Sequence, residues 1–280
     1  MNQYQQNTVG EPMTTTLTKT FSETEIASLA QDFLRQGYII LPEMISPEVC
    51  AEMRAEIDRI ERDVPAKHPE QGYGEPTRCN LFHYSKLFAD YIDFSPIVDI
   101  AEAILGPKFH LIANASAKSD RNFAVSDWHV DEEVMFPLPE GVEHDERVQI
   151  PCHAVNTQWY LTDVPTVEDG PTQIVPYSHR SGRPVPKLIN GELPSYRGHQ
   201  TKSFLVKAGT IAFQHSQTWH RGGPVSTDNV RVLLQYSYGR RSFSQRMYPF
   251  NGYKTPEHVL EGASARKRRL LGFHERSWWG

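Results

Sequence analysis

His129 and Asp131 are the residues of this chain from which a metal site could most readily be built. They stand in the segment Trp128-His129-Val130-Asp131. Side chains two residues apart on an extended strand point to the same face, so this imidazole and this carboxylate would lie side by side. Such a pair could supply two of the three protein ligands of a facial triad.

The spacing of this pair is weak evidence by itself. With 12 histidines and 34 acidic residues among 280, chance alone gives about 1.5 matches to the pattern His-x-acid. A rival match, His68-Pro69-Glu70, lies in a polar loop interrupted by proline. A third ligand elsewhere in the chain is therefore needed to support the first pair.

His220, in the segment Trp219-His220-Arg221-Gly222-Gly223, is the candidate third ligand. It follows a short apolar stretch and a polar turn, where a metal ligand could be presented at the end of a strand. His215 is its main competitor, and on one continuous strand the two histidines would point to opposite faces.

Arg231 favours the choice of His220. It alternates with Val230, Val232 and Leu234 on a predicted strand, so it faces the other side of the sheet from these apolar residues. An arginine on an interior face keeps its charge and must be paired. The partner is either an internal Asp or Glu, or a bound carboxylate held by two parallel hydrogen bonds.

The order His129-x-Asp131, His220, Arg231 resembles the phytanoyl-CoA dioxygenase family of Fe(II)/2-oxoglutarate oxygenases. Residues 159–163 and 169–180 resemble the middle stretch of that family, with an aromatic strand, a turn containing glycine, an apolar strand and a Ser-His turn. The resemblance covers roughly residues 24 to 245, and the combined spacing is specific where each motif alone is weak.

The resemblance implies a double-stranded β-helix, also called a jelly roll, with helices outside it. His129, Asp131 and His220 would bind Fe(II). In the family, 2-oxoglutarate is the cosubstrate, O2 is the oxidant and an arginine pairs with the far carboxylate of the cosubstrate, a role that falls to Arg231. Additional residues are expected near the ligands. The expected cosubstrate contacts are Trp159 and Asn114, and the expected substrate contacts, from chain order alone, are His83, Tyr84 and Phe136.

The sequence departs from the family pattern at two positions. Tyr177 occupies a position where glycine is usual, so the turn there must be built differently. Gly222 stands where a serine often helps to hold the cosubstrate carboxylate, which leaves that contact open. Asp131 is retained, whereas related halogenases have a small residue there to admit a halide, so halogenation is not expected.

The elements that must position these residues change in character along the chain. Helices are expected first, with Ser22 and Glu25 forming a capping box, Gly37 ending the first helix, Ser46-Pro47 starting the second and Ser95-Pro96 the third. A short strand is expected at 38–41. Later strands are expected at 109–117, 154–161, 172–175, 203–206, 210–213 and 230–238. This order predicts an α+β fold with a mainly β core at about 109–245.

Composition and charge restrict the possible partners. We expect a flexible tail at 1–20, a surface loop at 65–78 and a single domain at 21–280. The net charge of −5 gives no reason to expect nucleic acid or an anionic membrane, and no apolar run is long enough to span a bilayer. The three cysteines lack any CxxC spacing, so they indicate reduced thiols and a cytoplasmic protein. The basic run at 263–271 is interpreted as a solvated helix face, and a monomer or homodimer is expected.

The sequence thus predicts an Fe(II)- and 2-oxoglutarate-dependent dioxygenase that oxidises a small organic molecule, most simply a specialised metabolite, by hydroxylation, with desaturation or cyclisation as variants. Two alternatives stay open: a non-catalytic jelly-roll protein that binds metal or a carboxylate, and a cupin-type metalloenzyme of another class. A serine hydrolase is not indicated, because no Gly-x-Ser-x-Gly turn occurs.

Overall fold

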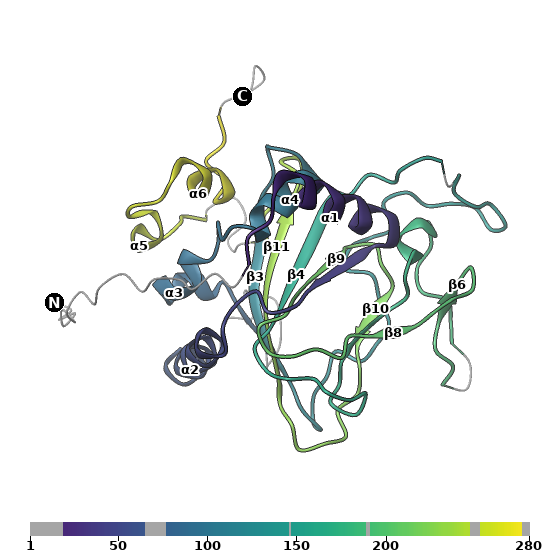
Figure 1. Ribbon diagram of the computed structural model, residues 1–280, viewed down its shortest axis with the longest axis horizontal. Coiled ribbons are helices and arrows are strands. Elements are labelled where there is room, and N and C mark those ends of the chain that lie inside the picture. The colour runs from purple at the N-terminus through teal and green to yellow at the C-terminus, as the bar shows by residue number, and fades with distance from the viewer. Residues whose placement is uncertain (1–18, 65–76, 146, 189–190, 247–252, 276–280) are drawn as a thin grey trace.

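A six-stranded antiparallel sheet lies between a layer of helices and a smaller three-stranded sheet (Figure 1). The computed structural model describes residues 19–64, 77–145, 147–188, 191–246 and 253–275. This arrangement confirms the α+β prediction, with helices early in the chain and antiparallel strands after them.

The elements have the following bounds. The helices are α1 (Glu23–Gln36), α2 (Pro47–Asp63), α3 (Lys86–Asp90), α4 (Ile97–Leu105), α5 (Glu257–Leu260) and α6 (Ala265–Leu270), with 3₁₀ turns η2 (Leu81–His83) and η3 (Ser178–Arg180). The strands are β1 (Tyr38–Leu41), β2 (Thr77–Cys79), β3 (His110–Ser119), β4 (Ala154–Tyr160), β5 (Thr172–Ile174), β6 (Ser195–Tyr196), β7 (His199–Gln200), β8 (Lys202–Ser203), β9 (Ile211–His215), β10 (His220–Gly222) and β11 (Arg231–Gly239). No helix among the described residues is long and apolar enough to cross a membrane.

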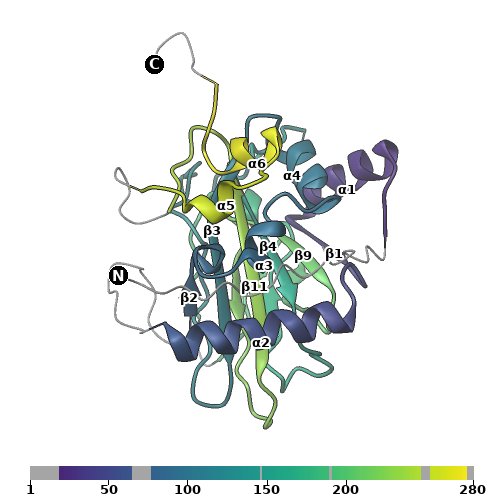
Figure 2. The same ribbon diagram turned by 90° about the vertical axis from the view of Figure 1, so that its left-hand side faces the viewer.

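The large sheet has the strand order β1-β9-β4-β11-β3-β2, and the small sheet has the order β10-β5-β8. Every pairing within them is antiparallel. The turned view in Figure 2 shows α2, α3 and α5 in front of the large sheet, on the side away from β8 and β10 in Figure 1. The two faces of the large sheet therefore have different neighbours.

The first helix forms as its end signals predict. Ser22 Oγ accepts a hydrogen bond from the Glu25 N–H at 3.3 Å, and the Glu25 carboxylate accepts one from the Ser22 N–H at 2.7 Å. Gly37 ends the helix in the left-handed region at φ 89°, a conformation that costs glycine least. A side chain there would also come within 2.7 Å of His179 Nδ1. β1 follows at once, at its predicted bounds of 38–41.

The predicted alternation along β11 separates two buried clusters. Val232, Leu234 and Tyr236 pack toward the helices, whereas Leu233 packs toward the small sheet. The cluster between the two sheets is much smaller than the helix-side core. It consists of Tyr38, Tyr160, Val164, Ile174, Phe204, Ala212 and Leu233. The interior between the sheets is therefore only partly filled by apolar side chains, and polar groups line the rest of it.

Several local predictions need correction. The strand expected at 203–206 is β8 at Lys202–Ser203, and β2 and β10 were not expected. Strands of two or three residues carry no readable periodicity, because one alternation fits almost any sequence. Residues 1–18 and 65–76, including most of the predicted tail and loop and the rival motif at His68, lie outside the described residues, while 77 and 78 begin β2.

The basic run at 263–271 is not a solvated face, and that interpretation was wrong. On α6, Arg266 is paired with Asp99 at 2.6 Å, and Arg269 is paired with Glu102 at 3.2 Å. Lys267 is only 8% exposed. Because Asp99 and Glu102 both belong to α4, the run attaches the C-terminal segment to the helical layer. Long basic side chains bury their stems readily when the charged end finds an acid, which the local sequence does not reveal.

Candidate metal centre

The structure brings His129, Asp131 and His220 together. One ligand atom from each lies within 4.8 Å of the others. The two histidines face each other across a β-bridge, in which each backbone N–H donates to the other's carbonyl at 2.9 and 3.0 Å. Asp131 Oδ1 lies 3.4 Å from His220 Nε2. Backbone pairing, rather than loop packing alone, therefore sets the separation of the ligands.

Backbone carbonyls fix which ring nitrogen of each histidine is free. His129 Nδ1 lies 2.7 Å from the Asp127 carbonyl, and His220 Nδ1 lies 2.9 Å from the Thr218 carbonyl. Since a carbonyl oxygen only accepts, each Nδ1 must carry the proton and each neutral Nε2 keeps its lone pair. Both rings are thus oriented to bind a metal through Nε2.

Asp131 is held from the side opposite the histidines. Its Oδ2 accepts a hydrogen bond from Asn156 Nδ2 at 2.5 Å and a longer one from Gln214 Nε2 at 3.5 Å. Oδ1 is left facing His220. The donor set of two neutral imidazoles and one carboxylate, with each supporting hydrogen bond made by the far atom, fits a divalent iron ion with open coordination positions.

The charges of the triad are coupled. Burial raises the pKa of Asp131, but the charges of His220, His129 and Arg246 and the hydrogen bond with His220 together lower it below its usual value, so the ionised carboxylate is favoured. Burial lowers the pKa of His220, but the charge and hydrogen bond of Asp131, together with the hydrogen bond to the Thr218 carbonyl, raise it above its usual value. Burial and the neighbouring His220 lower the pKa of His129. Because both imidazoles must be neutral to bind a metal, metal affinity is expected to fall in acid.

Asn156→Ala is expected to weaken Fe(II) binding by about 10- to 100-fold, because Asp131 loses the hydrogen bond that orients it. The measurement is an equilibrium metal titration of the folded variant under anaerobic conditions. Asn114→Ala is the matched control, since Asn114 is an equally buried asparagine on β3 of the same sheet that makes no contact with the triad. Equal metal affinities for the two variants would show that Asn156 does not support the metal.

A chain of amides continues inward from Asp131. Gln158 Nε2 donates to Gln214 Oε1 at 3.0 Å, and Gln214 donates in turn to Asp131. Thr172 and Tyr160 both donate to Gln158 Oε1, at 2.9 and 3.3 Å. Sequence reasoning missed Asn156, Gln158 and Gln214. The available signal was amides at alternate positions of apolar strands, where a buried polar group needs partners.

Arg231 lies at the inner end of this polar interior. It is 4% exposed, its Nη2 donates to Ser119 Oγ at 2.9 Å, and its Nη1 donates to the Gly170 carbonyl. Its Nε is buried without a partner. Within the described part of the chain Arg231 has no carboxylate partner, so the internal ion pair that the sequence left open is not found there. A buried guanidinium with unused donors suits an incoming carboxylate.

Gly222 connects this guanidinium to the triad. It lies on β10 two residues after His220, so the two positions share a face and are about 7 Å apart along the strand. A Cβ at residue 222 would lie 2.9 Å from Arg231 Nη2. The ligand histidine and the glycine that lies beside the arginine are therefore alternate positions of the same short strand.

Comparison with known proteins supports this geometry. The family model described as phytanoyl-CoA dioxygenase (PhyH) matches residues 33–233, well over half of the chain. The chain belongs to the phytanoyl-CoA dioxygenase family. A curated relative, dioxygenase trt7 of Aspergillus terreus, is 22% identical over 260 residues, which cover 87% of this chain and 82% of that one. This PhyH-family chain is accordingly a 2-oxoglutarate-dependent dioxygenase, with iron and 2-oxoglutarate as its cofactors.

Solved structures share the fold of the PhyH-family chain. HygX from Streptomyces hygroscopicus, with nickel and 2-oxoglutarate bound, has a TM-score of 0.59 at 17% identity over 78% of this chain and 88% of that one. The epimerase SnoN, in complex with Fe3+, alpha ketoglutarate and nogalamycin RO, has a TM-score of 0.60 at 20% identity over 84% and 93% of the two chains. At these identities the likeness establishes the fold.

Trp159 and Asn114 do not face the space between the two sheets of this PhyH-family chain, which corrects both predictions. Trp159 is fully buried on the helix-covered face of β4, where its ring lies 5.6 Å from that of Tyr91. Asn114 lies opposite Tyr236 on the same face, and its Oδ1 accepts a hydrogen bond from the Phe82 N–H. Directly paired residues of antiparallel strands share a face, so both point away from Arg231.

The three predicted substrate contacts are divided between two regions. His83 and Tyr84 lie in and after η2 on the helix-covered side, where His83 stacks on Tyr253 at 5.2 Å and Tyr84 packs against the helix-side core. They are not brought to the triad, and chain order was misleading there. Phe136 lies in the loop that follows Asp131 and is 39% exposed, so its role stays a prediction.

His215 and His179 form a buried pair outside the triad. His215 is 1% exposed and stacks on Phe33 at 5.9 Å, with its Nδ1 accepting from the Gln217 N–H. His179 lies 4.9 Å from it, ring to ring, and Nε2 of His179 contacts the Leu34 carbonyl at 3.2 Å. The competitor for the distal ligand is thus a packing residue, and His179 has a structural role beside it.

This pair is expected to make the protein acid-sensitive. Burial lowers the pKa of His179 to about 4 and that of His215 well below its usual value. Above the unfolded pKa near 6.5 both states are neutral, so stability is lost as pH falls below that value and the unfolded chain takes up protons. For His179 alone the loss between pH 7 and pH 5 is about 2 kcal/mol.

Urea unfolding of metal-free protein at pH 7 and pH 5 measures this loss. His179→Gln is expected to be less stable than the parent at pH 7 but to lose about 2 kcal/mol less between the two pH values. His199→Gln, which changes an exposed histidine, controls for general effects. An unchanged pH dependence in His179→Gln would contradict the assignment.

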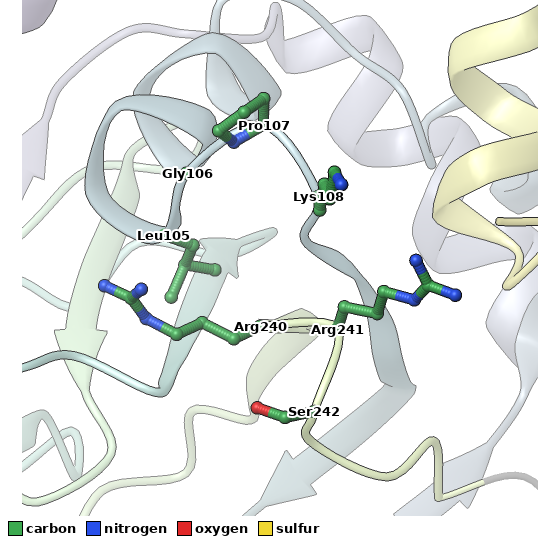
Figure 3. Close-up of a pocket in the computed structure, with 7 residues that line it drawn as sticks. All are labelled: Leu105, Gly106, Pro107, Lys108, Arg240, Arg241 and Ser242. Carbon is green, nitrogen blue, oxygen red and sulfur yellow. The ribbon is translucent and has the colours of Figure 1, made fainter. Parts of the chain in front are cut away.

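A separate pocket of about 710 Å³ lies between the end of α4 and the end of β11 (Figure 3). Lys108, Arg240 and Arg241 give it a basic lining. Figure 3 shows that Arg240 and Arg241 point in opposite directions from the end of β11. The pocket contains no residue of the triad, and its cations do not converge on one point, so it is not part of the candidate metal centre.

Proposed function

We propose that this enzyme hydroxylates a small organic molecule, most simply a specialised metabolite, and couples that reaction to decarboxylation of 2-oxoglutarate to succinate. The observation that carries the proposal is Arg231. It is a buried guanidinium with free donors and no carboxylate partner among the described residues. It lies beside Gly222, two residues along β10 from the triad ligand His220. A non-catalytic carboxylate binder would not need the triad, and a cupin-type enzyme of another class would not need the arginine.

Different residues bind the iron ion and the cosubstrate. His129, Asp131 and His220 hold the iron ion, which supplies the oxygen chemistry when bound. Arg231 fixes the far carboxylate of the cosubstrate and so sets the direction from which the keto acid reaches the metal. The hydrogen-bonded amides of Gln158 and Gln214 lie between the metal ligands and Arg231. None of these residues needs to act as an acid or base.

The two sheets support a finer description of the fold. We interpret the small sheet β10-β5-β8 facing the large sheet as the two halves of a double-stranded β-helix, within a single domain at 21–280. The triad then lies at the mouth of the barrel and Arg231 lies deeper. Phe136, in the loop after Asp131, is the predicted residue whose position suits contact with an apolar substrate.

Comparison with the solved structures supports a proposal for the substrate class. HygX has been solved with hygromycin B bound and SnoN with nogalamycin RO. By analogy a free small molecule, rather than a macromolecule, is the proposed substrate of this chain. Asp131 fills the position that a halide would need, so halogenation is not proposed. Stereochemical inversion is the alternative that the epimerase SnoN suggests, and because inversion is redox-neutral it would also need an external two-electron reductant to balance the reduction of O2.

Product analysis under isotope-labelled oxygen gas tests the proposal. The enzyme is supplied with Fe(II), 2-oxoglutarate and a panel of small molecules, and succinate release identifies active compounds. Hydroxylation incorporates one labelled oxygen atom into the product. Desaturation or cyclisation removes two hydrogen atoms without adding labelled oxygen. Inversion leaves both the number of hydrogen atoms and the oxygen content of the product unchanged. Any product without label would contradict hydroxylation while leaving the class of enzyme unchanged.

A further inference from the structure

Ser119 contacts the guanidinium of Arg231, which is also the group that the cosubstrate carboxylate would contact. It lies directly opposite Arg231 in the β3–β11 register and is 2% exposed. Its Oγ accepts a hydrogen bond from Arg231 Nη2 at 2.9 Å. A serine hydroxyl both accepts and donates. Ser119 therefore has a proton to donate to a neighbouring acceptor.

The side of Arg231 that faces β10 has no hydroxyl. Gly222 is the residue there, and it lies opposite Thr172 in the β10–β5 register. The Thr172 hydroxyl is already committed to Gln158 Oε1 at 2.9 Å. A Cβ at 222 would lie only 2.9 Å from Arg231 Nη2 and 3.1 Å from the Val125 carbonyl oxygen, so glycine keeps the space beside this nitrogen open. The hydroxyl that the guanidinium does contact is that of Ser119 on β3.

Arg231 retains unused donors for a ligand. A guanidinium has five N–H groups, and the protein accepts one from Nη1, at Gly170, and one from Nη2, at Ser119. Nε is buried and has no partner among the residues that the structure describes. Leaving a buried donor unsatisfied is costly, so the arrangement is complete only when a further acceptor is bound. A carboxylate is the acceptor that matches such a planar set.

We propose that Ser119 is a cosubstrate-positioning residue. Its hydroxyl holds Arg231 Nη2 and donates to the far carboxylate of 2-oxoglutarate, in place of the hydroxyl that Gly222 lacks. This inference rests on the proposed function, since it assumes that the acceptor at Arg231 is the keto diacid. It assigns the carboxylate-binding hydroxyl to a residue on β3, distant in sequence from the distal histidine.

Equilibrium binding to the anaerobic Fe(II)-loaded protein tests this assignment without turnover. The weak visible band of an iron-chelated keto acid is titrated with 2-oxoglutarate and with 2-oxobutanoate, which lacks the second carboxylate. Ser119→Ala is expected to weaken 2-oxoglutarate binding about tenfold or more, because a hydrogen bond to a charged group is lost. Binding of 2-oxobutanoate is expected to stay within about twofold of the parent value.

Ser116→Ala is the matched control. Ser116 is a buried serine on the same strand, 1% exposed, but it lies opposite Leu234 on the helix-covered face. It is expected to leave the binding of both keto acids unchanged. If Ser119→Ala weakens both keto acids equally, or neither, the proposal is wrong. If no keto acid gives a band in the parent protein, the proposed function fails instead.

Discussion

His220→Ala is expected to abolish turnover and to weaken Fe(II) binding by more than about a hundredfold. The loss must exceed the 10- to 100-fold cost typical of removing a supporting hydrogen bond, because a ligand itself is removed. The backbone pairing between His129 and His220, with N–H to carbonyl distances of 2.9 and 3.0 Å, does not involve the imidazole. The fold is therefore expected to persist, and metal titration with the keto acid band measures the effect.

His199→Ala serves as the control for His220→Ala. His199 is an exposed histidine on β7 that stacks on Tyr177 at 4.2 Å and contributes no ligand atom to the triad. It is expected to bind Fe(II) as the parent does. If His220→Ala kept its iron affinity and its band, the triad assignment would be wrong and His215, buried nearby, would have to be reconsidered.

Arg231→Leu is expected to weaken 2-oxoglutarate binding by about a hundredfold or more while leaving Fe(II) affinity unchanged. Removing one partner of a buried, hydrogen-bonded charge pair costs about 2–5 kcal/mol, and each 1.4 kcal/mol is about tenfold in affinity. The free protein need not lose stability by a similar amount, because the guanidinium is buried without a carboxylate partner in the described chain. Replacing such a charge by an apolar group is often tolerated.

The band titration with two keto acids separates the role of Arg231 from a structural one. Binding of 2-oxobutanoate, which has no far carboxylate, is expected to change little in Arg231→Leu. The affinity of Arg231→Lys for 2-oxoglutarate is expected to lie between the affinities of Arg231→Leu and the parent, because an ammonium keeps the charge but cannot make two parallel hydrogen bonds. A uniform loss for both keto acids would mean that Arg231 only maintains the shape of the interior.

The sequence determined the features that depend on short-range rules. The capping box at Ser22, the left-handed end at Gly37 and the strand at 38–41 follow from local backbone chemistry, and all three are present. The candidate ligands could be named because His-x-Asp, a later histidine and an interior arginine together match a family pattern, although each of them alone is weak evidence. The strand expected for His129 and Asp131 is only an isolated bridge at His129. The alternation on β11 likewise follows from a period of two.

The tertiary structure decided which face of each strand is the interior and what lies across it. Alternation separates Trp159 from Gln158, but only the packing of helices on one face shows that Trp159 belongs to the core and Gln158 to the site. The same holds for Asn114. Pairing between distant strands places Ser119 opposite Arg231, and no local signal carries that register.

The same physical reason explains the other corrections. The basic run on α6 is neutralised by acids of α4, far away in sequence, and short strands such as β10 exist only because a partner strand completes their hydrogen bonds. Local sequence fixes which conformations and faces are available, because those depend on neighbours along the chain. Which face is buried, and which donors stay unpaired there, depends on groups that only folding brings into contact.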